Sequence, residues 1–379
     1  MTDDLESDVR TPRAEQLLIE ATAEIAAERV LCTSLGWGQL ATSLAAQLPS
    51  AQVACHFLDL HPYEQARHIA GNLEARVVWL CSADLPEGPF DLAAIPVSRF
   101  GEAELTRDML QEAYERLTEE GLLVTAVDNR DDKWLHEELA KLFAKVTREP
   151  GRSGVVYRAI RRGPLKRRRD FRCEFAFRDQ GRLVKAVSRP GVFSHRELDL
   201  GARALLEVME VRAGDRVVDM GCGSGVVGLA AALRAERVFV QGIDSNARAV
   251  ACMAEGARLN EISLIGRDVV LYGRPEWMPQ EQDAVQPTDG PVVRLDCNAD
   301  GRVPEPGTYD LVVGNPPYYS HYQIAEIFLQ AAKRALKPGG RVHIVTKKDD
   351  WHLARMPQLF TDVKSREVRG YKVVSATAR

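Results

Sequence analysis

The second half of the chain alternates short apolar runs with stretches of helical periodicity. Apolar runs at residues 215–220 and 238–244 are typical of buried strands, and a glycine-rich loop follows the first of them. Strands that alternate with helices pair in parallel, so the pattern predicts an α/β fold with doubly wound, mostly parallel sheets. Further helices are predicted at 226–236, 245–261 and 323–337, and further strands at 309–313 and 341–346.

The first half repeats this order more faintly. Residues 29–48 resemble 216–233, and residues 90–100 resemble 309–319. The repeat predicts an internal duplication, that is, two tandem Rossmann-like domains with mostly parallel sheets. The segment Asn-Pro-Pro-Tyr of the second copy has no counterpart in the first, so we expect the N-terminal copy to be degenerate.

The spacing of landmark residues supports the duplication. Gly36 precedes Asp59 by the same interval at which Gly221 precedes Asp244. The first copy would then lack an acidic residue and a glycine that the second has, and would keep the fold without the site. The two positions paired in this way are Ser34 with Asp219 and Leu40 with Gly225.

A basic segment divides the chain near its middle. Eight arginines or lysines lie between residues 157 and 172, interrupted by Gly163 and Pro164. We expect three parts: a degenerate first-copy domain at 1–160, a basic linker at 161–189 and a second domain that carries the site at 190–379. The residues of this segment that could meet RNA phosphates are Arg161, Arg162, Lys166, Arg167, Arg168 and Arg169.

Composition narrows the class of protein. A length of 379 residues favours two domains, and a net charge of −4 argues against binding nucleic acid or membrane by bulk charge. Seven scattered cysteines suggest neither a disulfide framework nor a metal site, which favours a reducing compartment. No apolar run is long enough for a membrane span, and the N-terminus lacks the features of a signal peptide. We therefore expect a cytoplasmic protein with no metal and no membrane contact.

The glycine loop fits two ligands. Gly221, Gly223 and Gly225 let a ligand approach the backbone at a helix N-terminus, as both dinucleotides and S-adenosylmethionine do. Asp219 favours S-adenosylmethionine, because a carboxylate suits an ammonium or sulfonium group and repels a pyrophosphate. Asp244, at the end of the next strand, suits the two ribose hydroxyls that both ligands share.

The adenine contact is open between two residues. The segment 294–301 should end the third strand of the second copy, where either Asp296 or Asn298 could accept a hydrogen bond from the exocyclic amine. Asn298 is our first choice.

The segment Asn315, Pro316, Pro317 and Tyr318 follows a predicted strand. An aryl or amide nitrogen is a poor nucleophile because its lone pair is delocalised. The Asn315 oxygen and the Pro316 carbonyl can accept its two hydrogens and turn the lone pair toward a methyl donor. Pro316 and Pro317 would hold that carbonyl rigidly, and Tyr318 would offer a face for stacking.

Together these motifs resemble a known family. Residues 191–379 resemble class I methyltransferases, and more narrowly the bacterial ribosomal RNA guanine-N2 methyltransferases of the small and large subunits. The resemblance rests on the segments 190–207, 217–229, 314–319 and 371–379 and on the duplication itself. It implies that S-adenosylmethionine is the donor, that ribosomal RNA or a ribosomal particle is the partner, and that the first copy supports folding and contacts RNA. It also implies that residues 192–194 lie near the donor.

The resemblance has two departures. Many relatives carry phenylalanine where Tyr318 stands, and the segment 273–291 is an apparent insertion. Four other functions remain open at this stage: N-methylation of adenine in DNA or RNA, N-methylation of a protein glutamine, RNA binding with a vestigial donor site, and nicotinamide-dependent oxidation. The histidines His195, His321, His343 and His352 show no metal-ligand spacing and are assigned no chemistry.

Overall fold

The computed structural model describes residues 10–265, 271–272, 290–317 and 322–379. The chain divides into two compact units. The first comprises residues 1–171 and 271–279, and the second comprises residues 172–270 and 280–379. Within the described ranges, no helix combines the length and apolarity that crossing a membrane requires.

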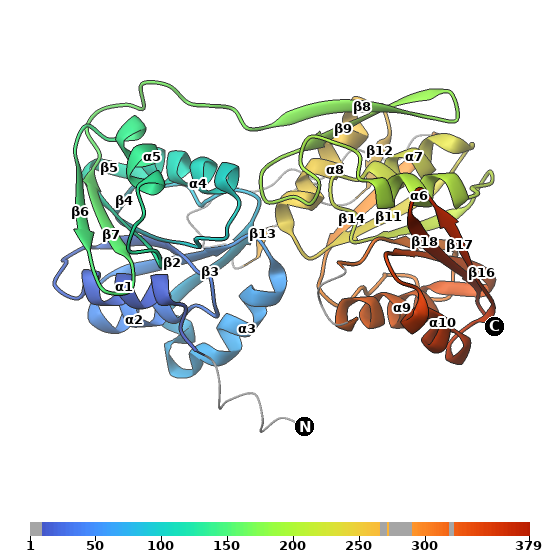
Figure 1. Cartoon of the computed structure of the whole chain (residues 1–379), viewed down its shortest axis with the longest axis horizontal. Helices are drawn as coiled ribbons and strands as arrows, with labels where there is room; N and C mark the ends of the chain where they lie inside the picture. Colours follow the sequence, from blue (N-terminus) through green and yellow to red (C-terminus); the bar gives the residue numbers. More distant parts are fainter. Residues whose placement is uncertain (1–9, 266–270, 273–289, 318–321) are drawn as a thin grey trace. The chain divides into compact units, whose positions relative to one another are not determined.

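The first unit is built on one eight-stranded sheet of order β13-β3-β2-β1-β4-β5-β7-β6 (Figure 1). Its strands are β1 (Arg29–Thr33), β2 (Gln52–Phe57), β3 (Val77–Ser82), β4 (Phe90–Val97), β5 (Leu117–Val127), β6 (Val146–Pro150), β7 (Val155–Ile160) and, from far along the chain, β13 (Leu271–Tyr272). Its helices are α1 (Arg13–Thr22), α2 (Gln39–Gln47), α3 (Leu60–Ala70), the 3₁₀ helix η1 (Gly71–Arg76), α4 (Ala103–Arg116) and α5 (Trp134–Leu142).

The second unit has a sheet of order β12-β14-β11-β10-β15-β16-β18-β17. Its strands are β10 (Arg216–Met220), β11 (Phe239–Asp244), β12 (Ser263–Ile265), β14 (Val292–Cys297), β15 (Tyr309–Gly314), β16 (Leu336–Thr346), β17 (Thr361–Val368) and β18 (Tyr371–Thr377). Its helices are α6 (Leu200–Val208), α7 (Val226–Arg234), α8 (Ala247–Leu259), α9 (Gln323–Ala335), α10 (Asp350–Arg355) and the 3₁₀ helix η2 (Met356–Gln358).

The two sheets share one topology. Five neighbouring strands run parallel in the first sheet, from β3 to β5, and six run parallel in the second, from β12 to β16. Beyond the last parallel strand, each sheet is extended by two strands in antiparallel pairing, β7 and β6 in the first unit and β18 and β17 in the second. Helices cover both faces of each sheet: α1, α2 and α3 lie opposite α4 and α5 in the first unit, and α6, α7 and α8 lie opposite α9 and α10 in the second (Figure 1). The predicted α/β class, doubly wound sheets and duplication are confirmed.

An aspartate at the same place in each unit joins two neighbouring strands. Asp91 Oδ2 accepts a hydrogen bond from the Arg29 backbone N–H at 2.9 Å, and Asp310 Oδ2 accepts one from the Arg216 N–H at 2.9 Å. In both units the aspartate is the second residue of the strand, and its donor is the first residue of the adjacent strand. This repeated contact fixes how the two copies correspond.

The sequence pairing of the two glycine loops is wrong by two residues. β1 and β10 have equal lengths, and the following helices are capped by Gly38 and Gly225, both left-handed with φ near 78° and 79°. This correspondence places Cys32, not Ser34, at the position of Asp219. Asp59 caps α3 as Asn246 caps α8, so its match in spacing to Asp244 is coincidental.

The predicted linker at 161–189 differs from the structure in its second half. Residues 173–188 form an antiparallel hairpin of β8 (Cys173–Asp179) and β9 (Arg182–Ser188) that belongs to the second unit. Alternation of buried apolar and exposed charged residues, which is typical of a strand, explains this hairpin. Phe177, Val184 and Ala186 are buried, whereas the adjacent Arg178 and Lys185 are exposed. The predicted helix at 323–337 also ends earlier, at Ala335, and β16 runs through Pro338 to Gly340.

Candidate active site

The glycine loop lies between β10 and α7, at the carboxyl edge of the second sheet. All three predicted glycines have positive φ, which L side chains rarely adopt. A Cβ added to Gly223 would meet nothing within 4 Å, so this glycine borders open space where a ligand can approach the backbone. The loop is held by hydrogen bonds from Cys222 N–H to the Ile243 carbonyl at 2.9 Å and from Gly225 N–H to the Cys222 carbonyl at 2.8 Å.

Asp219 lies beneath this loop and is 3% exposed. Its Oδ2 accepts a hydrogen bond from the Gly228 N–H at 2.7 Å, and a Cβ on Gly228 would lie only 2.8 Å from that oxygen. Burial raises the pKa of the Asp219 carboxyl to about 7, although the Gly228 bond opposes the shift. The neighbouring Asp244 raises it slightly further. A nearby cation would stabilise the charged form.

Asp244 ends β11 beside the loop. Its Oδ2 accepts from the Gly223 N–H at 2.8 Å, and its Oδ1 accepts from the Asn246 N–H at 2.9 Å. Both oxygens are therefore held in fixed directions while the side chain stays partly exposed. Such a carboxylate is suited to a pair of vicinal hydroxyls.

Asn298 follows β14 and carries an orphaned acceptor. Its Nδ2 donates to Asp296 Oδ2 at 3.0 Å and to the Arg302 carbonyl at 3.1 Å. Its Oδ1 is buried and meets no hydrogen-bond donor among the described residues. A buried acceptor without a donor costs about 1–3 kcal/mol, so a ligand amine would relieve that cost. Asp296, by contrast, already accepts from Asn298.

Asn315 directly follows β15. Its orientation is fixed by Asp199, a residue that the sequence analysis did not single out. Asn315 Nδ2 donates to Asp199 Oδ2 at 2.9 Å. Asp199 is the N-cap of α6, and the same oxygen accepts from the Ala202 N–H at 3.1 Å. With its nitrogen bound to a carboxylate, the Asn315 amide is held with Oδ1 on its other side.

The rest of the predicted acceptor segment is only partly described. Pro316 is buried and Pro317 is partly exposed, whereas Tyr318 lies outside the described residues. Past this gap, the Tyr322 ring stacks on Trp351 of α10 with centroids 4.8 Å apart and planes 7° apart. Trp351 is a second residue that the sequence analysis missed.

The segment before α6 is tied to the start of α8, next to Asp244. Asn246 Nδ2 donates to the Gly191 carbonyl at 3.1 Å, and the buried Arg248 donates to the Pro190 carbonyl at 2.9 Å. Val192 packs against α8, while Phe193 is 67% exposed. The predicted proximity of residues 192–194 to the donor fits this arrangement.

In the first copy, a glutamate occupies the corresponding loop. Glu15 of α1 is fully buried, and its Oε1 accepts hydrogen bonds from the Ser34 hydroxyl at 2.7 Å and from the Leu35 and Gly36 N–H groups at 2.7 and 3.0 Å. Its Oε2 accepts from the Leu40 N–H at 3.1 Å. The loop groups that a ligand would use are thus bound within the chain.

Three further positions of the first copy lack the polar groups of the second. By strand correspondence, Cys32, Phe57 and Pro96 stand where the second unit has acidic or amide side chains. The residues they replace are Asp219, Asp244 and Asn315.

The basic segment runs along α4. Gln111 of α4 exchanges hydrogen bonds with the Arg169 backbone at 2.9 and 3.0 Å, and Phe171 is buried. Arg161 donates to the Leu117 carbonyl. Three other arginines form exposed ion pairs with this unit: Arg162 with Glu120 at 3.5 Å, Arg168 with Glu115 at 3.1 Å and Arg169 with Glu104 at 3.5 Å.

The histidines, to which the sequence analysis assigned no chemistry, can be placed except for His321. Within the described part of the chain, no cluster of three or more His, Cys, Asp or Glu side chains could hold a metal ion. His343 and His352 are buried, and burial lowers the pKa of each to about 4. His195 bonds to the Ser188 hydroxyl at 2.8 Å, and His321 lies outside the described residues.

Comparison with known proteins identifies the family. Residues 184–276 and 287–375 match the family model described as the methyltransferase small domain. The chain belongs to this methyltransferase family. The enzyme is therefore S-adenosylmethionine-dependent, and the nicotinamide alternative is set aside.

Relatives of this methyltransferase match most of its length. Ribosomal RNA large subunit methyltransferase G from Streptomyces avermitilis is 26% identical over 344 residues, which cover 86% of this chain and 80% of the relative. The protein of the same name from Aeromonas hydrophila is 28% identical, covering 93% and 88%. Ribosomal RNA small subunit methyltransferase C from Alcanivorax borkumensis is 31% identical over 200 residues, covering 51% and 52%.

A solved structure shares the fold over nearly the whole chain. The 16S rRNA N2 methyltransferase RsmC from T. thermophilus, in complex with AdoMet and guanosine, matches this methyltransferase with a TM-score of 0.73. It is 19% identical, and the match covers 98% of this chain and 93% of that one. The match supports the same two-unit architecture.

Proposed function

We propose that this methyltransferase transfers a methyl group from S-adenosylmethionine to the 2-amino group of a guanine in ribosomal RNA. One observation carries the proposal: the Asn315 amide follows the end of β15, and its nitrogen is bound to Asp199, which fixes the direction of Oδ1, the atom that would accept from a substrate amine. The relatives named as ribosomal RNA methyltransferases, and the T. thermophilus structure with bound guanosine, support this choice of substrate.

The donor site uses the residues around the glycine loop. Asp244 binds the two ribose hydroxyls, and the orphaned Asn298 Oδ1 accepts from the adenine amine. Gly223 lets the ligand approach the backbone. Asp219 lies too deep to be a surface contact, so it acts as a buried negative charge that favours the donor's cationic amino acid and sulfonium groups.

The acceptor side orients a weak nucleophile. When bound, S-adenosylmethionine supplies an electrophilic methyl group, and the S–CH₃ electron pair stays with sulfur. Asn315 Oδ1 and the Pro316 carbonyl accept hydrogen bonds from the two N–H groups of the substrate amine, which directs its lone pair toward the donor methyl group. The nitrogen then releases one proton. Pro316 and Pro317 limit movement of the accepting carbonyl, and Tyr318 is proposed to stack on the base.

Two variants with opposite signatures test this assignment. Asn315→Ala should lower kcat by ~10² or more with donor affinity unchanged, because one oriented polar group acting on the transition state is lost. Asn298→Ala should weaken donor binding and change kcat far less. The measurements are methyl transfer to ribosomal RNA and calorimetric titration with the donor. Weakened donor binding with normal turnover in Asn315→Ala would contradict the assigned role.

We further propose that the first unit, a degenerate copy, supports the fold and contacts RNA. Its loop is closed to a donor by Glu15, whose carboxylate already accepts the available N–H groups. The basic segment contacts phosphates. Its exposed ion pairs contribute only ~0–1 kcal/mol each, so phosphates can replace the glutamates at little cost. We place the enzyme in the cytoplasm, which agrees with its ribosomal substrate and with seven free cysteines.

A further inference from the structure

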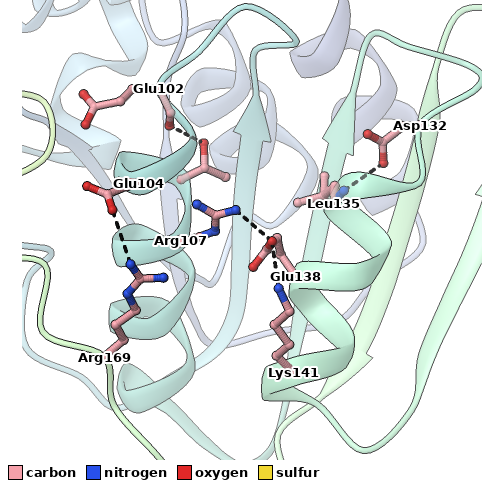
Figure 2. A network of polar contacts seen from close by, with 9 residues as sticks. Glu102, Glu104, Arg107, Asp132, Leu135, Glu138, Lys141 and Arg169 are labelled. Carbon is pink, nitrogen blue, oxygen red and sulfur yellow. Dashed lines mark hydrogen bonds and ion pairs between the residues drawn. The ribbon is translucent and has the colours of Figure 1, made fainter.

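A cavity of about 340 Å³ lies in the first unit, at the carboxyl ends of β4 and β5. Val97 and Ser98 line it from the end of β4, Val127 and Asn129 line it from the end of β5, and the first turns of α4 and α5 close it. Figure 2 shows these two helices side by side, with Glu102 and Asp132 near their N-terminal ends. The cavity is within the size range of small-ligand pockets.

The cavity is the first unit's counterpart of the methyl-acceptor site. β4 corresponds to β15, so Val97 and Ser98 stand where the second unit has Pro316 and Pro317. α5 begins with Trp134, which lines the cavity, as α10 carries Trp351 in its first turn. This copy lacks the corresponding polar groups. Pro96 stands at the position of Asn315, and Pro12, the N-cap of α1, stands at the position of Asp199, the N-cap of α6. The hollow remains without the catalytic amide.

We propose that this cavity binds one unpaired base of the RNA substrate, so that the first unit holds RNA by a base as well as by phosphates. The inference rests on the proposed function, because it takes RNA as the substrate. Its support comes from the lining, from an exposed aromatic ring and from the balance of charge.

The lining combines apolar walls with a few hydrogen-bonding groups. Asn129 Oδ1 accepts from the Asp131 N–H at 3.2 Å, which orients the amide, and its Nδ2 can serve as a donor. The Ser98 oxygen accepts from the Phe100 N–H at 3.3 Å, which leaves the hydroxyl proton to donate. Apolar walls with two donors suit a flat heterocycle that has acceptors on its edge.

An exposed aromatic residue belongs to the loop that lines the cavity. Phe100 lies in the sequence between the lining residues Arg99 and Gly101, and it is 83% exposed. The Arg99 guanidinium lies 4.5 Å from the centre of the Phe100 ring, a cation–π contact that holds the ring in place. A base stacked on this ring would remove apolar surface from water. Such stacking contributes about 1–3 kcal/mol per base.

The charges near the cavity favour a base over a phosphate. Arg99, the basic residue in the lining, pairs with Asp128 at 3.8 Å. Behind the cavity, Arg107 is paired with Glu138 at 3.0 Å, and Lys141 binds the same carboxylate at 2.9 Å, as Figure 2 shows. Because carboxylates neutralise its cations, the site has little attraction for the negatively charged phosphodiester of RNA but accepts a neutral ring.

Binding of a fluorescent single-stranded oligoribonucleotide to the full chain tests the proposal. Phe100→Ala removes the stacking ring, and Ala103→Leu places a larger side chain in the cavity from the first turn of α4. Each should weaken RNA binding about tenfold and raise the KM for RNA, with donor affinity unchanged. The matched control is Ile69→Ala, an exposed apolar residue of the same unit, which should bind RNA as the parent does.

The salt dependence separates a base from a phosphate. Loss of a stacked base weakens binding at every salt concentration and leaves the slope of log K against log salt unchanged. A reduced slope in both variants would show that phosphates occupy the cavity, and would overturn the proposal. RNA affinities equal to the parent's would overturn it as well. Donor binding and methyl transfer by the parent are measured separately, so failure of the proposed function would appear there.

Discussion

The hydrogen bond between Asp199 and Asn315 can be tested by separating the two roles of the aspartate. One Asp199 oxygen both caps α6, through the Ala202 N–H at 3.1 Å, and accepts from Asn315 Nδ2 at 2.9 Å. Asp199→Ala removes both hydrogen bonds. Asp199→Ser keeps an oxygen that can cap α6, but its side chain is too short to reach Asn315. Asp199→Asn keeps an oxygen that can accept both hydrogen bonds.

The expected magnitudes depend on which hydrogen bond each substitution removes. Removal of an N-cap costs about 1 kcal/mol of stability, and a hydrogen bond to a charged group contributes about 1.5–3 kcal/mol. Without Asp199 the Asn315 amide can rotate and present its nitrogen to the substrate amine. We therefore expect Asp199→Ser to lower kcat about tenfold or more while retaining the stability contributed by the helix cap. Asp199→Ala should show the same decrease in kcat with a lower free energy of unfolding, and Asp199→Asn should be affected least.

A double variant shows whether Asp199 acts through Asn315. In single-turnover methyl transfer, Asp199→Ser combined with Asn315→Ala should be no slower than Asn315→Ala alone, because the group being oriented is already absent. Thermal unfolding of each variant controls for folding. An unchanged kcat in Asp199→Ser, or a further decrease in the double variant, would refute the orienting role.

Two other predictions concern charge. Burial raises the folded pKa of Asp219 to about 7, above its unfolded value, so its contribution to stability is present at low pH and is lost as pH rises through about 7. Because the cationic donor favours the carboxylate, calorimetry should show donor affinity rising between about pH 6 and about pH 8, and Asp219→Asn should abolish that rise. Replacing Arg167, Arg168 and Arg169 with alanine should weaken RNA binding and flatten its salt dependence; an unaltered slope would exclude phosphate contacts by this segment.

The sequence located the elements of the second unit well because its signals are local. Positive-φ glycines, a carboxylate ending a strand and an asparagine before two prolines can all be recognised within a few residues. The predicted strands and helices around Gly223, Asp244 and Asn315 agree with the structure to within a few residues at most ends.

The missed residues depend on contacts between distant segments. Asp199 has the sequence signature of a helix cap, and its second partner is visible only once α6 and β15 are side by side. Trp351 becomes part of a stack only through Tyr322. Glu15 resembles any surface glutamate on an amphipathic helix, although folding buries it completely. The spacing of apolar and polar residues along the chain does not indicate these contacts between distant segments.

The buried Glu15 also makes the loss of the first donor site hard to reverse. An aspartate at Cys32 would meet the Cβ of Ala41, where the second copy has Gly228. Replacing Glu15 alone would leave four loop donors without their acceptor. Either substitution alone would therefore lower the stability of the fold before a bound ligand could compensate. Restoring the donor site one substitution at a time would pass through a destabilised protein. The duplicate is free to diversify as a binding surface but not to return to catalysis by gradual change.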